Sequence, residues 1–123
     1  MPIMALFRSP RVDQNLYDAI IQDLDLEQAP AAGALTHSCG FDNNGICVVD
    51  VWETRGHFEA FLADRLRPTF AKLNIEFVEP VIIDAYAFTA TEDVDQYVRE
   101  RAAGFQAAGK AAATDERPAG PAH

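Results

Sequence analysis

The sequence predicts an α+β domain of the ferredoxin-like class, βαββαβ, with an antiparallel sheet and helices on one face. Three observations favour it. A short β-rich run precedes a run with helical spacing, an Asn-Gly pair separates two further β-rich runs, and a second helical stripe precedes a last run of β-formers.

The first half of the chain supplies a strand, a helix and a second strand. Residues 2 to 8, PIMALFR, form an apolar run that a Ser-Pro pair ends, as expected of a strand followed by a turn. Asp13 offers an N-cap to an amphipathic helix. Its apolar stripe comprises Leu16, Ile20 and Leu24. A proline and a glycine end this helix before ALTHSCG, residues 34 to 40, which we interpret as the second strand.

An Asn-Gly pair predicts a hairpin between the second and third strands. A two-residue turn at 44–45 would pair His37 with Trp52, whereas a turn at 43–44 would pair His37 with Asp50. Either register places His37, Asp50 and Trp52 on one face of the sheet. A bulged three-residue loop would separate them, because one inserted residue turns every later side chain to the other face.

The second half predicts a helix, a fourth strand and an extension. Thr54 can cap the helix, and Pro68 interrupts it, so a short new helix is expected near Pro68. Residues 80 to 88, PVIIDAYAF, give the fourth strand. The chain then divides into a barrel domain (1–90), a C-terminal helical extension (91–108) and a flexible tail (109–123).

Side chains alternate across a strand, so each strand divides into two sets. We assign the more apolar sets of the third and fourth strands to the helix-covered face: Cys47, Val49, Val51, Val81, Ile83, Ala85 and Ala87. The amphipathic sets then form the open face: Val48, Asp50, Trp52, Ile82, Asp84, Tyr86 and Phe88. An open face with so many apolar groups predicts a homodimer, in which two sheets enclose a pocket between them.

Composition limits the partners. The 123 residues carry 19 acidic and 10 basic side chains, a net charge of −9 that repels nucleic acid and anionic lipid alike. No apolar run approaches the roughly 20 residues that cross a bilayer, and the N-terminus lacks a basic leader, so we expect a cytoplasmic protein. Cys39 and Cys47 lack metal-ligand spacing, and Asp50 and Asp84 have too few companions for a metal site, so no metal or cofactor is expected.

Four stretches resemble the dimeric α+β barrel superfamily, which includes the antibiotic-biosynthesis monooxygenase-like proteins. They are LYDAIIQDLDL, PAAGALTHSCGFDNNG, VVDVWETRGHFEAFLADRLRPTFAKL and PVIIDAYAF, within residues 2 to 88. The strand-to-helix passage that begins VVDVWET is the most specific of them. Within the superfamily, the chain is most similar to a branch of small bacterial proteins.

The resemblance implies a pocket and a reaction. In monooxygenase-like relatives a tryptophan at the end of the third strand lines the substrate pocket, and Trp52 matches that position. Those enzymes oxidise aromatic polyketides without metal or flavin. Haem-degrading relatives use a histidine on the following helix, where this chain has Leu62, and His57 lies too early, so the resemblance does not imply haem.

His37 and Asp50 are the candidate catalytic residues. A carboxylate beside an imidazole favours the charged ring and fixes its tautomer, so His37 is predicted to act as a general base or as a donor to a ligand. The alternative is a structural pair that satisfies itself at the dimer interface. The candidate ligand-binding residues are Trp52, as a flat wall for stacking, with Tyr86, Asp84 and Phe41.

The predicted function is that of a small-molecule enzyme resembling cofactor-independent monooxygenases, acting on a cyclic or aromatic metabolite. Two alternatives stay open. The same pocket suits a non-catalytic protein that binds a small apolar or aromatic ligand, and His37 as a base suits an isomerase or a lyase.

Overall fold

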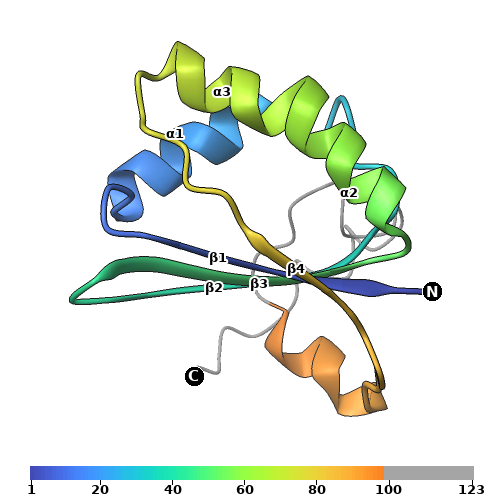
Figure 1. Ribbon diagram of the computed structural model, residues 1–123. Helices are drawn as coiled ribbons and strands as arrows, with labels where there is room; N and C mark the ends of the chain where they lie inside the picture. Colours follow the sequence, from blue (N-terminus) through green and yellow to red (C-terminus); the bar gives the residue numbers. More distant parts are fainter. Residues whose placement is uncertain (99–123) are drawn as a thin grey trace.

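The computed structural model describes residues 1–98, and four of its segments form one antiparallel sheet (Figure 1). The strands are β1 (Ile3–Ser9), β2 (Ala34–Asp42), β3 (Gly45–Trp52) and β4 (Val81–Asp84), in the spatial order β2-β3-β1-β4. The helices α1 (Gln14–Leu24), α2 (Arg55–Phe61) and α3 (Arg67–Lys72) cover one face of the sheet. The ferredoxin-like α+β fold is therefore confirmed.

Capping side chains fix where two helices begin. Asp13 Oδ1 accepts a hydrogen bond of 2.9 Å from the backbone N–H of Leu16, and Thr54 Oγ1 accepts one of 3.0 Å from that of His57. Each satisfies a donor that the first turn of a helix leaves without a partner. Both caps are those that the sequence predicts.

Pro68 lies inside a continuous helical segment. A π-helical turn, η1 (Leu62–Leu66), connects α2 to α3 without a break. Proline has no N–H for an α-helical hydrogen bond, and the wider π turn shifts the bonding register just before it. Pro68 then falls in the first turn of α3, where its missing donor costs little. The predicted interruption at Pro68 is therefore wrong, although an α-helical turn does begin at Arg67.

The hairpin adopts the second of the two predicted registers. Asp42 pairs with Gly45, so residues 43–44 form the turn, and His37 lies opposite Asp50. A β-bulge at Leu35 shifts the pairing only beyond His37. The bulge therefore leaves His37, Asp50 and Trp52 on one face of the sheet.

The predicted assignment of the two sheet faces is wrong. Trp52 is 1% exposed and packs beneath the helices, with ring centroids 5.2 Å from Phe58 and 5.1 Å from Phe61. Val81 and Ile83, expected under the helices, are 59% and 47% exposed. Both alternating sets are rich in apolar residues, so choosing the more apolar set did not identify the helix-covered face.

The open face is instead formed by the other alternating sets. The register of β1 with β3 and β4 places eight side chains on it: Met4, Leu6, Arg8, Cys47, Val49, Val51, Val81 and Ile83. Ile82 packs against the core under the helices. The fourth strand ends at Asp84, so the predicted strand residues 85 to 88 lie outside the sheet.

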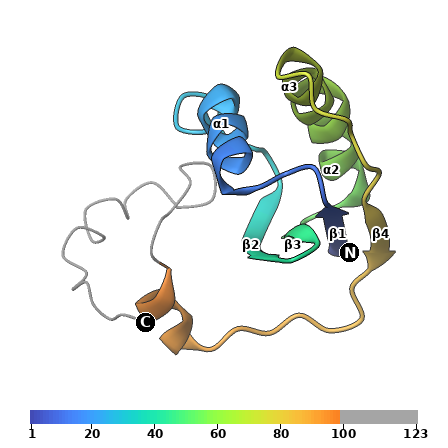
Figure 2. The same ribbon diagram turned by 90° about the vertical axis from the view of Figure 1, so that its left-hand side faces the viewer.

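The chain after β4 passes to the side of the sheet opposite the helices (Figures 1 and 2). There it forms η2 (Glu92–Tyr97), a short 3-10 helix, within the predicted helical extension. The remainder of that extension and the predicted tail, residues 99–123, lie outside the described residues.

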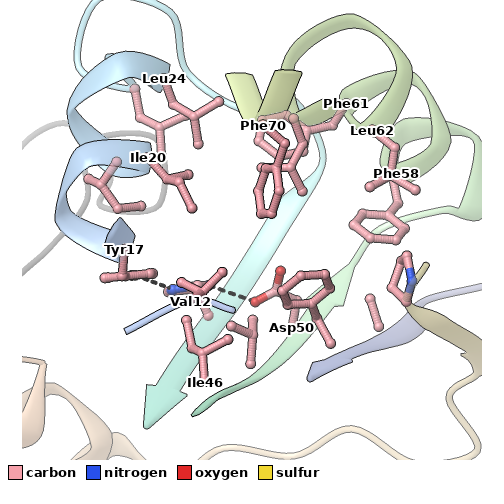
Figure 3. A pocket seen from close by; sticks show the side chains of 18 of the residues that line it. Val12, Tyr17, Ile20, Leu24, Ile46, Asp50, Phe58, Phe61, Leu62 and Phe70 are labelled. Carbon is pink, nitrogen blue, oxygen red and sulfur yellow. Dashed lines mark hydrogen bonds and ion pairs between the residues drawn. The ribbon is translucent and has the colours of Figure 1, made fainter. Parts of the chain in front are cut away.

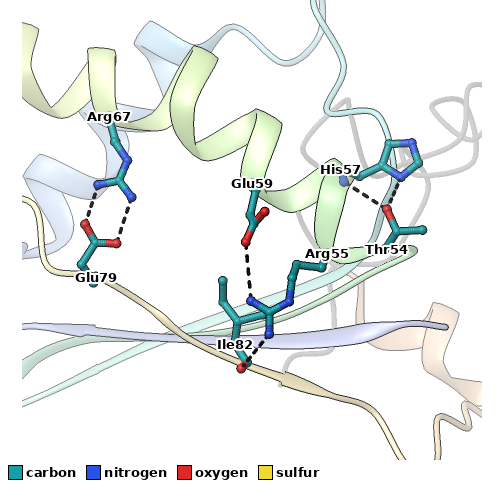
Figure 4. A network of polar contacts seen from close by, with 7 residues as sticks. All are labelled: Thr54, Arg55, His57, Glu59, Arg67, Glu79 and Ile82. Atoms are coloured by element: carbon teal, nitrogen blue, oxygen red, sulfur yellow. Dashed lines mark hydrogen bonds and ion pairs between the residues drawn. The ribbon is translucent and has the colours of Figure 1, made fainter.

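Ion pairs connect the α2–α3 segment to the chain around β4 (Figure 4). The guanidinium of Arg67 binds both carboxylate oxygens of Glu79, with Nη2 2.9 Å from Oε1. This bidentate contact lowers the pKa of Glu79. Arg55 approaches both Glu59 and the carbonyl oxygen of Ile82, each at 3.5 Å. These contacts hold the helices over the sheet edge.

Candidate functional site

A cavity lies between the sheet and the helices, within the single chain (Figure 3). Its volume is about 90 Å³, counted as the space open to the centre of a water molecule. One water needs about 10–15 Å³ by that measure, so the cavity has room for a small organic molecule. Most of its walls are apolar, including Ile20, Leu24, Phe58, Phe61, Leu62 and Phe70.

The cavity is therefore covered by the chain's own helices. The sequence predicts a pocket between two facing sheets, because it places Asp50 and Trp52 on the open face. Because both residues lie under the helices, the observed pocket lies within the chain and not between two facing sheets. Asp50 can lie there because its carboxylate is hydrogen-bonded, which offsets much of the cost of its burial.

Three polar side chains among these walls form a continuous chain of hydrogen bonds. His37 Nδ1 lies 2.7 Å from Asp50 Oδ1, and His37 Nε2 lies 2.7 Å from the Tyr17 hydroxyl. The indole Nε1–H of Trp52 points to the second oxygen of Asp50, over a longer distance of 3.4 Å. Figure 3 shows the chain of bonds crossing the floor of the pocket from Tyr17 to Asp50.

The bonding partners fix the tautomer of His37. An ionised carboxylate only accepts hydrogen bonds, so Nδ1 carries the proton toward Asp50. In the neutral ring Nε2 is then an acceptor, and the Tyr17 hydroxyl donates to it. The side chains of His37 and Asp50 are 22% and 13% exposed, so water screens this interaction weakly.

Tyr17 is fixed by aromatic contacts as well. Its ring is parallel to that of His37 to within 5°, with centroids 6.1 Å apart, and it meets Phe41 edge-on at 6.1 Å. The Cys39 thiol is hydrogen-bonded to Tyr17, and burial, the largest effect, raises the pKa of that thiol. The phenol is thus held from several sides at the edge of the pocket.

The structure brings together three of the six predicted site residues. His37, Asp50 and Trp52 line the cavity. Phe41 packs on Tyr17 but is not among the lining residues. Asp84 is exposed at the end of β4, and Tyr86 is fully exposed beyond it.

Sequence reasoning missed Tyr17. The residue shares the buried face of α1 with Ile20 and Leu24, at helical spacing, and it lies 20 positions before its partner His37. The available signal was a hydroxyl on an otherwise apolar helix face. A buried hydroxyl needs a partner, and that requirement pointed toward the sheet.

The backbone of this chain is similar to that of a solved protein. That protein comes from Chloroflexus aurantiacus J-10-fl and is provisionally assigned as an antibiotic biosynthesis monooxygenase. The two chains are 16% identical, and the match covers 72% of this chain and 95% of the other, with a TM-score of 0.46. No protein-family model and no curated protein sequence matches the chain.

No helix among residues 1–98 has both the length and the apolar character that a membrane span requires. In the same part of the chain, no three His, Cys, Asp or Glu side chains gather as metal ligands would.

Proposed function

We propose that this protein is a small-molecule enzyme of the cofactor-independent monooxygenase type, which binds a cyclic or aromatic metabolite in the pocket and removes a proton from it. The observation that carries the proposal is the Tyr17–His37–Asp50 chain of hydrogen bonds in an otherwise apolar cavity. Few, converging polar groups in an apolar pocket are typical of sites that orient and activate a small ligand.

Deprotonation is the chemistry that these groups supply. The anion of an electron-rich polycyclic phenol, such as an anthrol, is reducing enough to transfer an electron to dioxygen directly. Oxidation to a quinone then consumes one O2, with one oxygen atom entering the product and the other leaving as water. The protein's contribution is a positioned base and walls that exclude water, including the indole of Trp52.

Oxygen uptake tests this proposal directly. Wild-type protein is mixed with naphthols and anthrols in an oxygen electrode, beside the His37→Asn variant. We expect His37→Asn to lower the rate by about 100-fold or more, the usual contribution of a general base. His57→Asn, at an exposed histidine in α2, is the matched control and should leave the rate unchanged. Unchanged turnover with lower stability in His37→Asn would identify a structural pair instead.

One observation favours a second candidate, a non-catalytic ligand-binding protein. Both ring nitrogens of His37 already have partners within the chain. Native mass spectrometry of purified protein distinguishes the two functions, because a binding protein retains an unaltered ligand and consumes no oxygen. An isomerase or a lyase would transform its ligand, also without oxygen uptake.

We propose further that the open sheet face binds a second copy of this chain. Among its side chains on β1, β3 and β4 only Arg8 is charged, and it is paired with Asp42, although the whole chain carries a net charge of −9. A two-fold axis would set this apolar surface against its own copy and leave the like charges outside the contact. A basic partner protein would instead be attracted to the acidic surface outside this sheet face.

The solution mass tests the dimer. Wild-type protein should have twice the mass of the chain, and Ile83→Glu should shift it to the monomer. Asn15→Glu, which adds the same charge on the exposed side of α1, should remain dimeric. A monomeric wild type at micromolar concentration would refute this part of the proposal, and the pocket would be unaffected.

A further inference from the structure

We propose that Tyr17 is the residue that exchanges a proton with the ligand, and that His37 and Asp50 act through it. The inference rests on the proposed function and assigns the role of base to a different atom. His37 is engaged at both nitrogens, by Asp50 on one side and by Tyr17 on the other. Tyr17 lies on the side of His37 away from Asp50, its hydroxyl is also hydrogen-bonded to the Cys39 thiol, and its side chain lines the cavity.

The direction of the bonds suits proton removal from a ligand. Asp50 accepts from Nδ1, and Nε2 accepts from the Tyr17 hydroxyl. When a ligand hydroxyl gives its proton to the Tyr17 oxygen, the phenol proton moves to Nε2. The products are a ligand anion, a neutral Tyr17 and an imidazolium beside the carboxylate of Asp50. No bond other than O–H and N–H changes, and no electron is transferred.

The fold holds Tyr17 in place for this step. The residue lies in the first turn of α1, where its backbone N–H donates to the Asp13 carbonyl oxygen at 2.9 Å. The helix therefore fixes its backbone, while contacts with the rings of His37 and Phe41 fix its side chain. A base on a helix and its partner on a strand keep their 2.7 Å separation only while helix and sheet stay packed.

The walls of the cavity indicate the class of ligand. Among the described residues 1–98, no Lys or Arg lines the cavity. A ligand that arrives as a carboxylate or a phosphate would therefore lose its solvation without a counter-charge. A neutral phenol or enol avoids this cost, because its charge appears only as the imidazolium forms 2.7 Å from Tyr17. We infer a flat, neutral substrate with one acidic hydroxyl.

A coloured phenol reports binding and ionisation separately. The probe is 4-nitrophenol, at a pH below its own pKa, where the free probe is mostly protonated. Binding is followed by quenching of Trp52, the single tryptophan of the chain, and ionisation by the yellow absorption of the phenolate. We expect wild-type protein to bind the probe as the phenolate.

Variants then locate the base. Tyr17→Phe should bind the probe within about threefold of wild type and lose the phenolate absorption. His37→Asn should lose it as well, and the double variant should be no worse than either single one, because the two residues act as one unit. Tyr86→Phe, at a fully exposed tyrosine, is the matched control and should behave as wild type.

Each other outcome decides against the inference in a recognisable way. If Tyr17→Phe keeps the phenolate absorption and His37→Asn loses it, His37 is the direct base. If wild type binds the probe without ionising it, the proposed proton transfer through Tyr17 is wrong, while ligand binding in the pocket is still supported. If wild type fails to bind 4-nitrophenol and also 1-naphthol, the proposed function fails together with the inference. Should Tyr17→Phe not fold, wild type labelled with 13Cζ-tyrosine replaces it, and an unchanged Tyr17 signal on probe binding overturns the inference.

Discussion

His37 and Asp50 face each other directly across the β2–β3 hairpin, with Nδ1 and Oδ1 2.7 Å apart. The turn at residues 43–44 sets this register. A slip by one residue along either strand would send one of the two side chains to the opposite face of the sheet. The turn at residues 43–44 thus determines that His37 and Asp50 both face the pocket.

Asp50→Asn is expected to keep the fold and to abolish ionisation of the bound probe. An amide accepts from Nδ1 but carries no charge to stabilise the imidazolium, and its NH2 group would face the indole N–H of Trp52. We expect the free energy of unfolding to fall by about 1.5–3 kcal/mol in urea titrations. Asp84→Asn, at an exposed carboxylate, should change it by less than about 0.5 kcal/mol. Full ionisation of the probe by Asp50→Asn would argue against the relay.

The pH dependence of stability should report on Asp23. Lys72 Nζ lies 2.6 Å from one carboxylate oxygen and Thr69 Oγ1 2.8 Å from the other, and both contacts lower the pKa of Asp23, Lys72 the more strongly. A carboxyl with a lowered pKa adds stability that is present above the ordinary carboxyl range and is lost as the pH falls through the lowered pKa.

We therefore expect Asp23→Asn to be less stable than wild type near neutral pH, and the difference to shrink as the solution is acidified. Urea denaturation at a series of pH values measures it. Asp18→Asn, at an exposed position of the same helix, should follow the wild-type curve. A difference that is constant with pH would show that the charge of Asp23 contributes nothing.

Cys39 should react slowly with iodoacetamide at neutral pH. Burial raises the pKa of its thiol, so less of the reactive thiolate is present than for an ordinary cysteine. Because the chain has two cysteines, the measurement uses Cys47→Ser. The rate should rise as the pH passes above the ordinary thiol range, and the urea-unfolded protein supplies the reference rate. Equal rates in the folded and unfolded protein would contradict this prediction.

Gly33→Ala should destabilise the protein. Gly33 has φ +89°, where a side chain costs about 1–2 kcal/mol, and a Cβ there would also collide with the His57 side chain. We expect a loss above about 2 kcal/mol in urea denaturation, the sum of the two costs. Gly40→Ala is the control, because a Cβ at Gly40 meets no heavy atom within 4 Å. Equal stabilities of the two variants would show that the loop before β2 rearranges.

Much of the fold is encoded locally and could be predicted. The caps at Asp13 and Thr54 depend on hydrogen bonds between side chain and backbone three residues apart. The hairpin depends on a short turn between two β-rich runs. The length of β4 could not be predicted in this way, because a strand lasts only as long as its neighbour pairs with it.

The sequence by itself determined the order of the elements and predicted His37, Asp50 and Trp52 on a common side of an unbulged hairpin, because alternation along a strand is a property of the local backbone. The tertiary structure decided which side the helices cover, and it brought Tyr17 against His37 across 20 positions of chain. Both strand faces are apolar, so no local preference separates them. Only the packing of α1 and the α2–α3 segment on the sheet, which buries Trp52 and gives Asp50 its partners, selects one arrangement.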